Sequence, residues 1–204
     1  MLLKAGIQKE TTGVTVHKRQ ELINTAFKLF YQNGIHAVGI NQILKESGIA
    51  KKTLYHHFAS KEQLLLAVIN YRDKVFLEWF ISHIKAADPG LPAIEAIFDA
   101  LDDWFNNRAE ALTQFQGCFF INTCAEFGDL SHQAHQMCAE HKQRIEDLVR
   151  EQVDQLPIET GHKELTQTIC QLKEGAIVQA HIQGDLGAAK RSKGVAGVLV
   201  GVVG

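Results

Sequence analysis

The chain has 204 residues and a formal net charge of −2 at pH 7, and 46% of its residues are hydrophobic. This length is enough for one domain, or two small ones, with a buried core. No apolar run approaches the roughly 20 residues that a membrane-spanning helix needs, and residues 1–17 lack the apolar segment of a secretory signal. These features argue against any association with a membrane and favour a cytoplasmic protein, in which the four cysteines remain thiols.

Charge is distributed unevenly along the chain. Residues 1–61 contain nine lysine or arginine residues and three glutamates, a formal charge of +6, which leaves −8 for the remainder. A basic head on an acidic body is the electrostatic pattern of a DNA-binding domain joined to a second functional region. The overall charge alone argues against a nucleic-acid partner, and its distribution reverses that argument.

The chain begins with an arm and a helix. Residues 1–16 are expected to form a flexible arm, in which Lys4 and Lys9 either contact phosphates or are simply solvated. A helix is predicted from about His17 to Gln32, because apolar residues recur there at helical spacing. Gly34 suits the left-handed residue that follows a helix.

Residues 41–61 carry the motif around which the chain is organised. Residues 41–46 are predicted as the first helix of a helix-turn-helix unit, with Gly48 in the turn. In the short helix that follows, Leu54 and Phe58 are spaced to face a core. Their spacing leaves polar side chains on the other face, of the kinds that bind phosphates and base edges. The expected DNA-binding residues are Lys51, Lys52, Thr53, Tyr55, His56 and Lys61.

The next helix is long and begins inside the basic head. Ser60 and Gln63 form a capping-box pattern at its start, and it is predicted to run from Lys61 to about Ala86. Lys61 lies where backbone N–H groups and the helix dipole favour a phosphate, so it is the best single candidate for a phosphate contact. Ala50 leaves the preceding short helix without a capping side chain, at a cost of about 1 kcal/mol.

The rest of the chain is predicted as helix, without a strand or an internal repeat. The segment from Gly117 to Phe127 is almost wholly apolar, as a buried central helix would be. The other predicted helices cover residues 91–107, 129–155, 160–183 and 186 onward. The fold class is therefore all-α.

Histidine spacing after residue 130 invites a metal-site interpretation. His132, His135, Cys138 and His141 are three residues apart. Steps of three drift by about 60° each around a helix, so only neighbouring pairs share a side, whereas a tetrahedral zinc site needs four convergent ligands. No metal site, cofactor or catalytic residue is predicted.

The apolar central helix contains two thiols and one carboxylate. Cys118 and Cys124 are interpreted as inert buried thiols, because a redox or electrophile sensor needs a lowered thiol pKa and no cation flanks either residue in the sequence. Glu126, at the end of this helix, needs a partner. The candidates are a cationic effector, an arginine such as Arg72 or Arg108, and solvent.

Aromatic side chains are frequent after residue 70. They supply either core packing or the walls of an effector cavity between helices, and most of them are expected in the core. The expected cavity lining is Tyr71, Trp79, Trp104, Phe105, Phe119, Phe120, Thr123 and Glu126.

Several anchors at fixed spacing in residues 18–66 resemble the TetR family of transcriptional repressors. They are Ala26-Phe27-x-Leu29-Phe30-x-x-x-Gly34, Ile43-Leu44-x-x-x-Gly48-Ile49, Lys51-x-Thr53-Leu54-Tyr55-x-His57-Phe58 and Ser60-Lys61-Glu62-x-Leu64-Leu65. The segment 117–127 also resembles the central helix of one subgroup of such regulators. Two positions depart from the family pattern: Ala50 replaces the usual cap, and Val38-Gly39 stands where the family often has a hydroxyl residue that touches phosphate.

The resemblance implies an all-α homodimer whose last two helices pair with those of the partner in a four-helix bundle. It implies an arm at 1–16, a helix-turn-helix DNA-binding domain at 17–62, and an effector-binding and dimerisation domain at 63–204. A dimer places two recognition helices about 34–36 Å apart on a near-palindromic site. The expected interface residues, an apolar seam and several glycines, are Leu165, Ile169, Leu172, Ala176, Ala180, Gly194, Gly197 and Gly201.

The leading hypothesis is a sequence-specific repressor that a small-molecule effector releases from its operator in double-stranded DNA. One alternative is a DNA-bound activator or architectural dimer. Another is a helical enzyme that happens to carry a helix-turn-helix, for which the sequence offers neither a nucleophile–base pair nor a glycine-rich phosphate loop.

Overall fold

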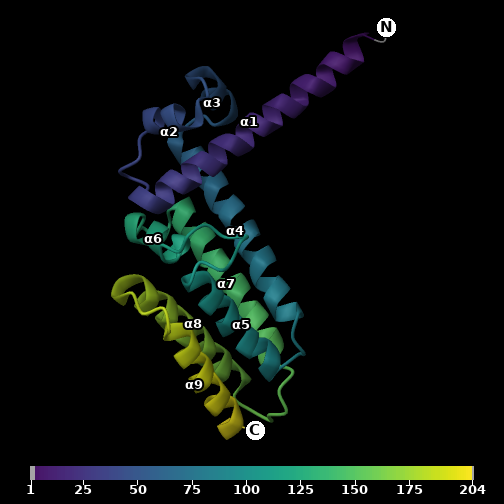
Figure 1. The fold of residues 1–204 in the computed structure, drawn as a ribbon, viewed down its shortest axis with the longest axis vertical. Coiled ribbons are helices and arrows are strands. Elements are labelled where there is room, and N and C mark those ends of the chain that lie inside the picture. Colours follow the sequence, from purple (N-terminus) through teal and green to yellow (C-terminus); the bar gives the residue numbers. More distant parts are fainter. Residues whose placement is uncertain (1–2, 204) are drawn as a thin grey trace. The chain divides into compact units, whose positions relative to one another are not determined.

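The computed structural model describes residues 3–203, with side chains for residues 16–202, and this part of the chain is helical without strands (Figure 1). The all-α prediction is confirmed. The expected arm at residues 1–16 lies almost wholly outside the residues described with side chains, so it stays a prediction. The helices are α1 (Leu3–Asn33), α2 (Ile40–Ser47), α3 (Lys51–His57), α4 (Lys61–Lys85), α5 (Leu91–Phe105), α6 (Phe119–Glu126), α7 (Gln133–Val153), α8 (His162–Gln183) and α9 (Ala188–Val203).

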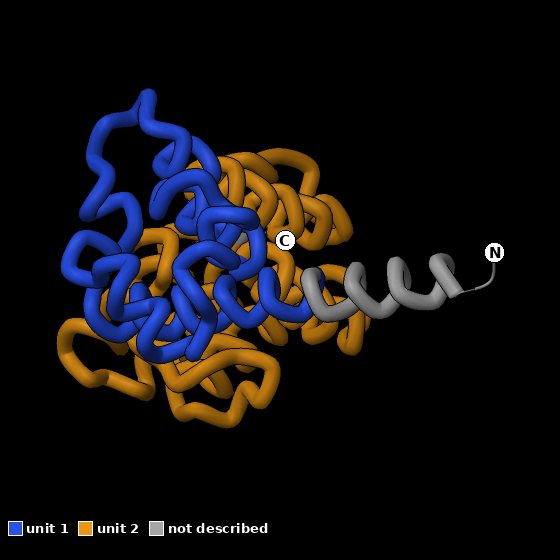
Figure 2. Tube along the Cα trace, turned by 90° about the horizontal axis from the view of Figure 1, so that it is seen from above, with its two compact units in different colours: residues 1–72, 122–137 blue, residues 73–121, 138–204 orange. Residues whose placement is uncertain are grey.

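The chain divides into two compact units, shown in different colours in Figure 2. Unit 1 comprises residues 1–72 and 122–137, and unit 2 comprises residues 73–121 and 138–204. Helices α4, α6 and α7 each contribute residues to both units. The compact units therefore differ from the division expected at residue 62, because segments distant in sequence complete unit 1.

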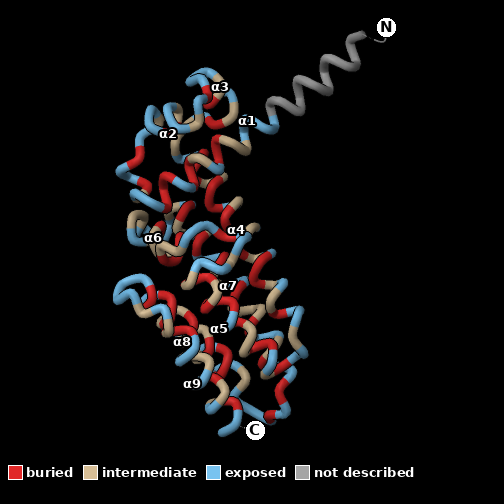
Figure 3. The backbone as a smooth tube through the Cα atoms, in the orientation of Figure 1, coloured by how far each residue is buried: buried red, intermediate tan, exposed pale blue. Residues whose placement is uncertain are grey.

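The core of unit 1 is built on the apolar stripe of α1, which packs against α2 and α3. Leu22, Ala26 and Phe30 on this stripe are buried, and Ile43 from α2 is fully buried as well (Figure 3). Burying a side chain of this kind stabilises the folded state by about 1.5–3 kcal/mol. These contacts fix α2 and α3 on α1.

The core of unit 2 is rich in aromatic rings. Trp104 lies with its ring centroid 5.3 Å from that of Phe76 and 4.9 Å from that of Phe115, in edge-to-face arrangements that favour aromatic packing. Helix α9 packs against α5 and α8, and its small residues Ala189 and Ala196 are fully buried. The small side chains allow the helices to approach closely.

Most helix boundaries lie within a few residues of their predicted positions, but two do not: α1 begins at Leu3 and not at about His17, and α7 begins later than expected. The sequence places its start at Asp129, whereas the helix begins at Gln133. The Asp129 carboxylate accepts the Ser131 N–H at 2.8 Å, which stabilises a turn instead. Within the described residues, no helix combines the length and apolar character required to cross a membrane.

Candidate nucleic-acid interface and ligand cavity

The turn between α2 and α3 has the predicted helix-turn-helix geometry. Gly48 has a φ of +66°, in the left-handed region that glycine adopts without strain. Ala50 occupies the N-cap position of α3 without a side-chain capping bond, so the loss of a cap expected from the sequence is confirmed. Ile49 is buried beside the turn and anchors it to the core.

Helix α3 divides into a buried and an exposed face as its residue spacing predicts. Leu54 is fully buried, and Phe58, directly after the helix, is buried too. The ammonium of Lys51 lies 6.0 Å from the ring centroid of Tyr55, so a cation and a phenol are neighbours on the exposed face. We call the exposed and half-exposed residues of this face the α3 surface: Lys51, Lys52, Thr53, Tyr55 and His56.

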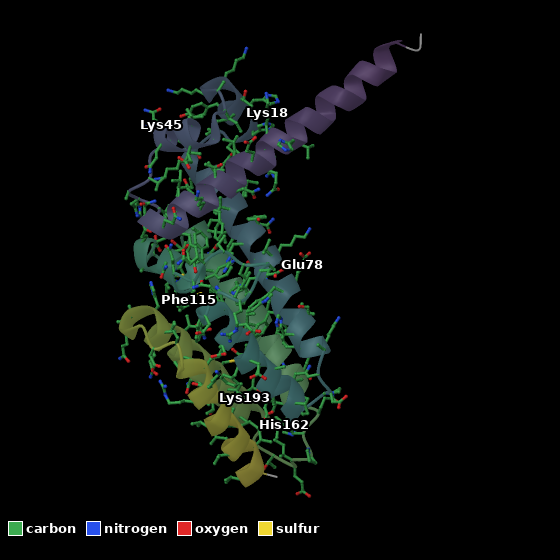
Figure 4. All side chains as sticks on the ribbon, in the orientation of Figure 1. Lys18, Lys45, Glu78, Phe115, His162 and Lys193 are labelled. Atoms are coloured by element: carbon green, nitrogen blue, oxygen red, sulfur yellow. The ribbon has the colours of Figure 1, made fainter. Side chains whose placement is uncertain are left out.

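Further cations, which we did not select from the sequence, belong to the same unit. Lys18 and Arg19 on α1 and Lys45 on α2 are exposed, and Figure 4 labels the two lysines. The guanidinium of Arg19 lies 5.1 Å from the ring centroid of Phe58, which brings it to the end of α3. The excess positive charge of residues 1–61 could have indicated that these residues belong to the DNA interface, because they are three of the nine cations in that segment.

The structure corrects the role expected for Lys61. Its ammonium donates a hydrogen bond to the carbonyl oxygen of Ile35 at 2.6 Å and lies 5.8 Å from the ring centroid of Phe30. Burial lowers the pKa of Lys61, and the charge of Glu126 opposes this shift. The ammonium is therefore engaged within unit 1 and is not held out as an open phosphate contact.

The start of α4 carries the predicted cap with one change. The Gln63 N–H donates to the Ser60 hydroxyl oxygen at 3.1 Å, as a capping box requires. The Gln63 side chain accepts a hydrogen bond from the N–H of Ala59, at 3.1 Å, rather than from Ser60. The cap stabilises the corner between α3 and α4.

Glu126, the last residue of α6, has a partner that none of the three expected alternatives included. Its carboxylate accepts the N–H of Ile35 at 2.7 Å and the N–H of His36 at 2.6 Å, and it also contacts the His36 ring nitrogen Nδ1 at 2.9 Å. Burial works against the charge, but these hydrogen bonds outweigh it and hold the pKa of Glu126 below its ordinary value. Glu126 thus ties α6 to the loop between α1 and α2.

Gly34 leaves room for this carboxylate. It has a φ of +85°, and a Cβ built at this position would lie 3.4 Å from Glu126 Oε1. The loop contact also borders a cavity of about 250 Å³. That cavity is lined by Ile35, His36, Lys61, Glu62, Leu65, Phe127 and His132.

The residues expected to line an effector cavity are mostly core residues. Trp79, Trp104, Phe105, Phe119, Phe120 and Thr123 are buried, and Tyr71 is half-buried against Phe27. Neither these residues nor Glu126 line the two cavities described here. The physical reason is that aromatic rings that pack edge-to-face fill the space that a ligand would need.

Unit 2 contains a larger cavity, of about 700 Å³, that we did not anticipate from the sequence. Its lining combines charged and polar side chains with apolar surface, and we call it the lysine cavity. Its residues are Ile121, Lys142, Ile145, Glu146, Gln167, Cys170, Gln171, Lys173 and Glu174. One signal was available: Lys173 follows Ile169 by four residues on the apolar stripe of α8, where a charged side chain is out of place.

Two lysines share one carboxylate in the lysine cavity. Glu174 accepts hydrogen bonds from the ammonium groups of Lys142 at 2.7 Å and of Lys173 at 2.5 Å. Burial raises the pKa of Glu174, but the two cations outweigh it and lower the value to about 2. Lys142 also lies 3.5 Å from the sulfur of Cys118. No cation flanks Cys118 in the sequence, but in the structure helix α7 places the Lys142 ammonium beside its sulfur.

The four residues considered for a metal site have separate surroundings. His132 lies 3.5 Å from a Glu62 oxygen, and His135 contacts the carbonyl of Phe127 at 2.8 Å. His141 contacts Asp73 at 2.7 Å, and Cys138 is buried. Among the described residues, no group of three or more His, Cys, Asp or Glu side chains is arranged to hold a metal ion.

The seam expected at a dimer interface packs inside the chain itself. Leu165, Ile169, Ala176 and Ala180 are buried within the single chain. Leu172 and Gly197 are half-buried, and Gly194 and Gly201 are exposed. Helix α8 packs against α9 and α5, so its four buried residues are not open to a partner, whereas the interface role of Gly194 and Gly201 stays a prediction.

Taken together, a helix-turn-helix with a polar α3 surface, followed by a helical unit with a cavity, is the arrangement of a DNA-binding transcriptional regulator. Comparison with known families agrees. A model described as bacterial regulatory proteins of the tetR family matches residues 22–68, and one described as the tetracyclin repressor-like C-terminal domain matches residues 90–194. The chain belongs to the TetR family of transcriptional regulators, whose members are not enzymes.

Individual relatives share part of the sequence. The uncharacterized HTH-type transcriptional regulator YxaF of Bacillus subtilis is 38% identical over 82 residues, which are 39% of this chain and 40% of that protein. UidR of Escherichia coli is 33% identical over 91 residues, 45% of this chain and 46% of that one. The chain spans less than half the length of these curated relatives.

Solved structures resemble the chain over most of its length. A TetR-family regulator from Streptomyces coelicolor has a TM-score of 0.80 at 25% identity, with 91% of this chain and 95% of that chain covered. The reduced form of NemR from Escherichia coli has a TM-score of 0.73 at 20% identity, with coverage of 87% and 94%. The second likeness supports the fold alone.

Proposed function

We propose that this protein is a homodimeric transcriptional repressor that binds a near-palindromic operator and leaves it when a small molecule binds unit 2. The α3 surface is the observation that carries the proposal. It offers two cations, a hydroxyl, a phenol and an imidazole on a helix that Gly48 and Leu54 hold in helix-turn-helix geometry. Lys51 and Lys52 would contact phosphates, while Thr53, Tyr55 and His56 would read bases or groove shape. Such a protein acts in the cytoplasm, where its DNA target lies.

Dimerisation is supported by apolar side chains that remain exposed on α8, on α9 and in the turn between them. Several large apolar side chains exposed on neighbouring segments favour a partner, and the partner proposed here is a second copy. These residues are added to the exposed glycines Gly194 and Gly201 of the interface expected from the sequence. They are Val178, Ile182, Leu186, Val195, Val198 and Val202.

Release is proposed to run through α6. This helix carries Ile121, which lines the lysine cavity, and ends at Glu126, which holds the loop before α2. A ligand that shifts α6 would change the hold of Glu126 on that loop and, through it, the position of α2 and α3. The ligand acts only through its different affinities for the two states.

Selection of genome fragments by the purified protein tests the proposal. A near-palindromic site whose affinity falls steeply with salt is the expected result. Binding that is indifferent to sequence would overturn the proposal. A reporter gene placed behind the recovered site separates repression from activation, because deleting the regulator raises expression only in the first case.

A further inference from the structure

The lysine cavity has the size and the mixed lining of a small-molecule site. Its volume of about 700 Å³ lies within the range of roughly 300–1,000 Å³ that ligand pockets occupy. All of its lining residues belong to unit 2. Gln167 and Gln171 are exposed, so the cavity is open to solvent and a ligand can enter.

Two ammonium groups in this cavity share the single carboxylate of Glu174. Lys173 is only 2% exposed, and it shares the Glu174 carboxylate with Lys142. Both ammonium groups therefore bond directly to one carboxylate, Glu174, while Glu146, the other carboxylate of the lining, makes the formal charge of the lining zero. Burial and the neighbouring Lys142 charge lower the pKa of Lys173, although Glu174 opposes the shift. An anionic ligand would give the two ammonium groups a second direct partner.

The other walls offer apolar surface. Ile121 and Ile145 line the cavity. Burial raises the pKa of the Cys170 thiol to about 11, so this side chain is a neutral thiol that packs as a small apolar group. Glu146 is the one feature that works against an anion, because it brings a second carboxylate to the lining one helical turn after Lys142.

We propose that the lysine cavity binds a small organic acid, whose carboxylate pairs with Lys142 and Lys173 while its apolar body lies against Ile121 and Ile145. The inference rests on the proposed function in one respect: the acid would be the effector. It names the chemical class of ligand, which neither the fold nor the family membership supplies. Glu146 lies in the same lining and would favour acids with a neutral body, since a second negative group would be repelled.

Titration calorimetry with the purified full-length protein tests the ligand class. The probes are octanoate and benzoate, their neutral amides octanamide and benzamide, and the cation octylamine. We expect at least one carboxylate to bind about tenfold or more tightly than its own amide, and octylamine to bind more weakly than octanoate. Equal or tighter binding of the amides or of octylamine would overturn the inference.

Variants locate the site. Lys142→Met and Lys173→Met should each remove the preference for carboxylate over amide, while Lys163→Met, on the exposed side of α8, should keep it. If Lys173→Met unfolds the protein, the double variant Lys173→Met/Glu174→Gln removes the buried pair without leaving a lone charge, and it should show the same loss. A carboxylate preference that survives in the Lys142 and Lys173 variants would sink the assignment.

Release of the operator DNA fragment from the protein tests the proposed effector role separately from ligand binding. The operator fragment recovered by selection is titrated with the same probes. If the acid binds but the DNA stays bound, the inference stands and the effector role falls. If an amide or an amine releases the DNA while no carboxylate binds, the repressor proposal stands and the inference falls.

Discussion

The carboxylate of Glu126 lies 2.6 Å from the backbone nitrogen of His36, ninety residues away in the sequence. A second oxygen accepts the N–H of Ile35. These bonds join the end of α6 to the loop that precedes α2, and both partners belong to unit 1. Hydrogen bonds to a charged acceptor are among the stronger ones in proteins, so the loop is held firmly while Glu126 stays ionised.

Replacing Glu126 by Gln is expected to lower the free energy of unfolding by about 1.5–3 kcal/mol, because the amide keeps the shape but can accept only one of the two backbone N–H bonds. Urea unfolding of the variant and the wild type measures this loss. The matched control is Glu110→Gln, at an exposed position, for which no change is expected. Equal stability of the wild type and the Glu126 variant would contradict the role given to this contact.

His141 predicts a pH dependence of stability. Its ring is buried, stacks on Phe120 with centroids 3.5 Å apart, and contacts Asp73. Burial lowers the pKa of His141 to about 4, although the hydrogen bond to Asp73 opposes the shift. Between pH 6.5 and about 4 the unfolded chain therefore binds a proton that the folded chain does not, so stability falls as the pH falls through this window.

The expected size of this effect is about 3 kcal/mol, at 1.36 kcal/mol for each pKa unit. Urea unfolding of the wild type and of His141→Asn, measured at pH 7 and pH 4, gives the comparison; the asparagine keeps a donor for Asp73 and does not titrate. The advantage of the wild type should shrink by this amount at pH 4. His162→Asn is a control of opposite sign, because its bond to the Ile158 carbonyl and its contact with Asp154 raise the pKa of His162.

The α3 surface predicts two separable losses of DNA binding. Lys52→Ala should weaken binding to all sequences alike and reduce the slope of log affinity against log salt by about 0.9, the value for one phosphate contact. Tyr55→Phe should leave that slope unchanged and relax the preference at one base position if the hydroxyl reads a base edge. Lys85→Ala, an exposed lysine of unit 2, serves as the control, and a salt slope unchanged by Lys52→Ala would remove this residue from the interface.

Local rules predicted the helix-turn-helix well, and tertiary pairings escaped them. Gly48, Leu54 and the Ser60–Gln63 cap follow from spacing and capping chemistry within a few residues. The partners of Glu126 could not be read in this way, because chain folding decides which backbone amides meet its carboxylate. Lys173 is an intermediate case. Its place on an apolar stripe indicated a buried charge next to Glu174 in the sequence, but the second ammonium group on Glu174, that of Lys142 in α7, could not be predicted from local spacing.

The apolar stripe of α8 is another case in which residue spacing predicts burial but not the partner that covers the buried residues. Its periodicity predicted a buried face correctly, but not that the chain itself would cover it.

The apolar side chains that remain exposed define the proposed dimer surface, and Ile182, at 73% exposure, is among the most exposed of them. Leu130 in unit 1 is equally exposed, at 74%, and has the same size. Ile182→Glu should place two carboxylates at the proposed interface and shift sedimentation toward a monomer at micromolar concentration, and operator affinity should fall with it because one chain reaches one half-site. Leu130→Glu introduces the same charge on a surface of similar exposure and should sediment as the wild type does. A dimer unchanged by Ile182→Glu would place the interface elsewhere.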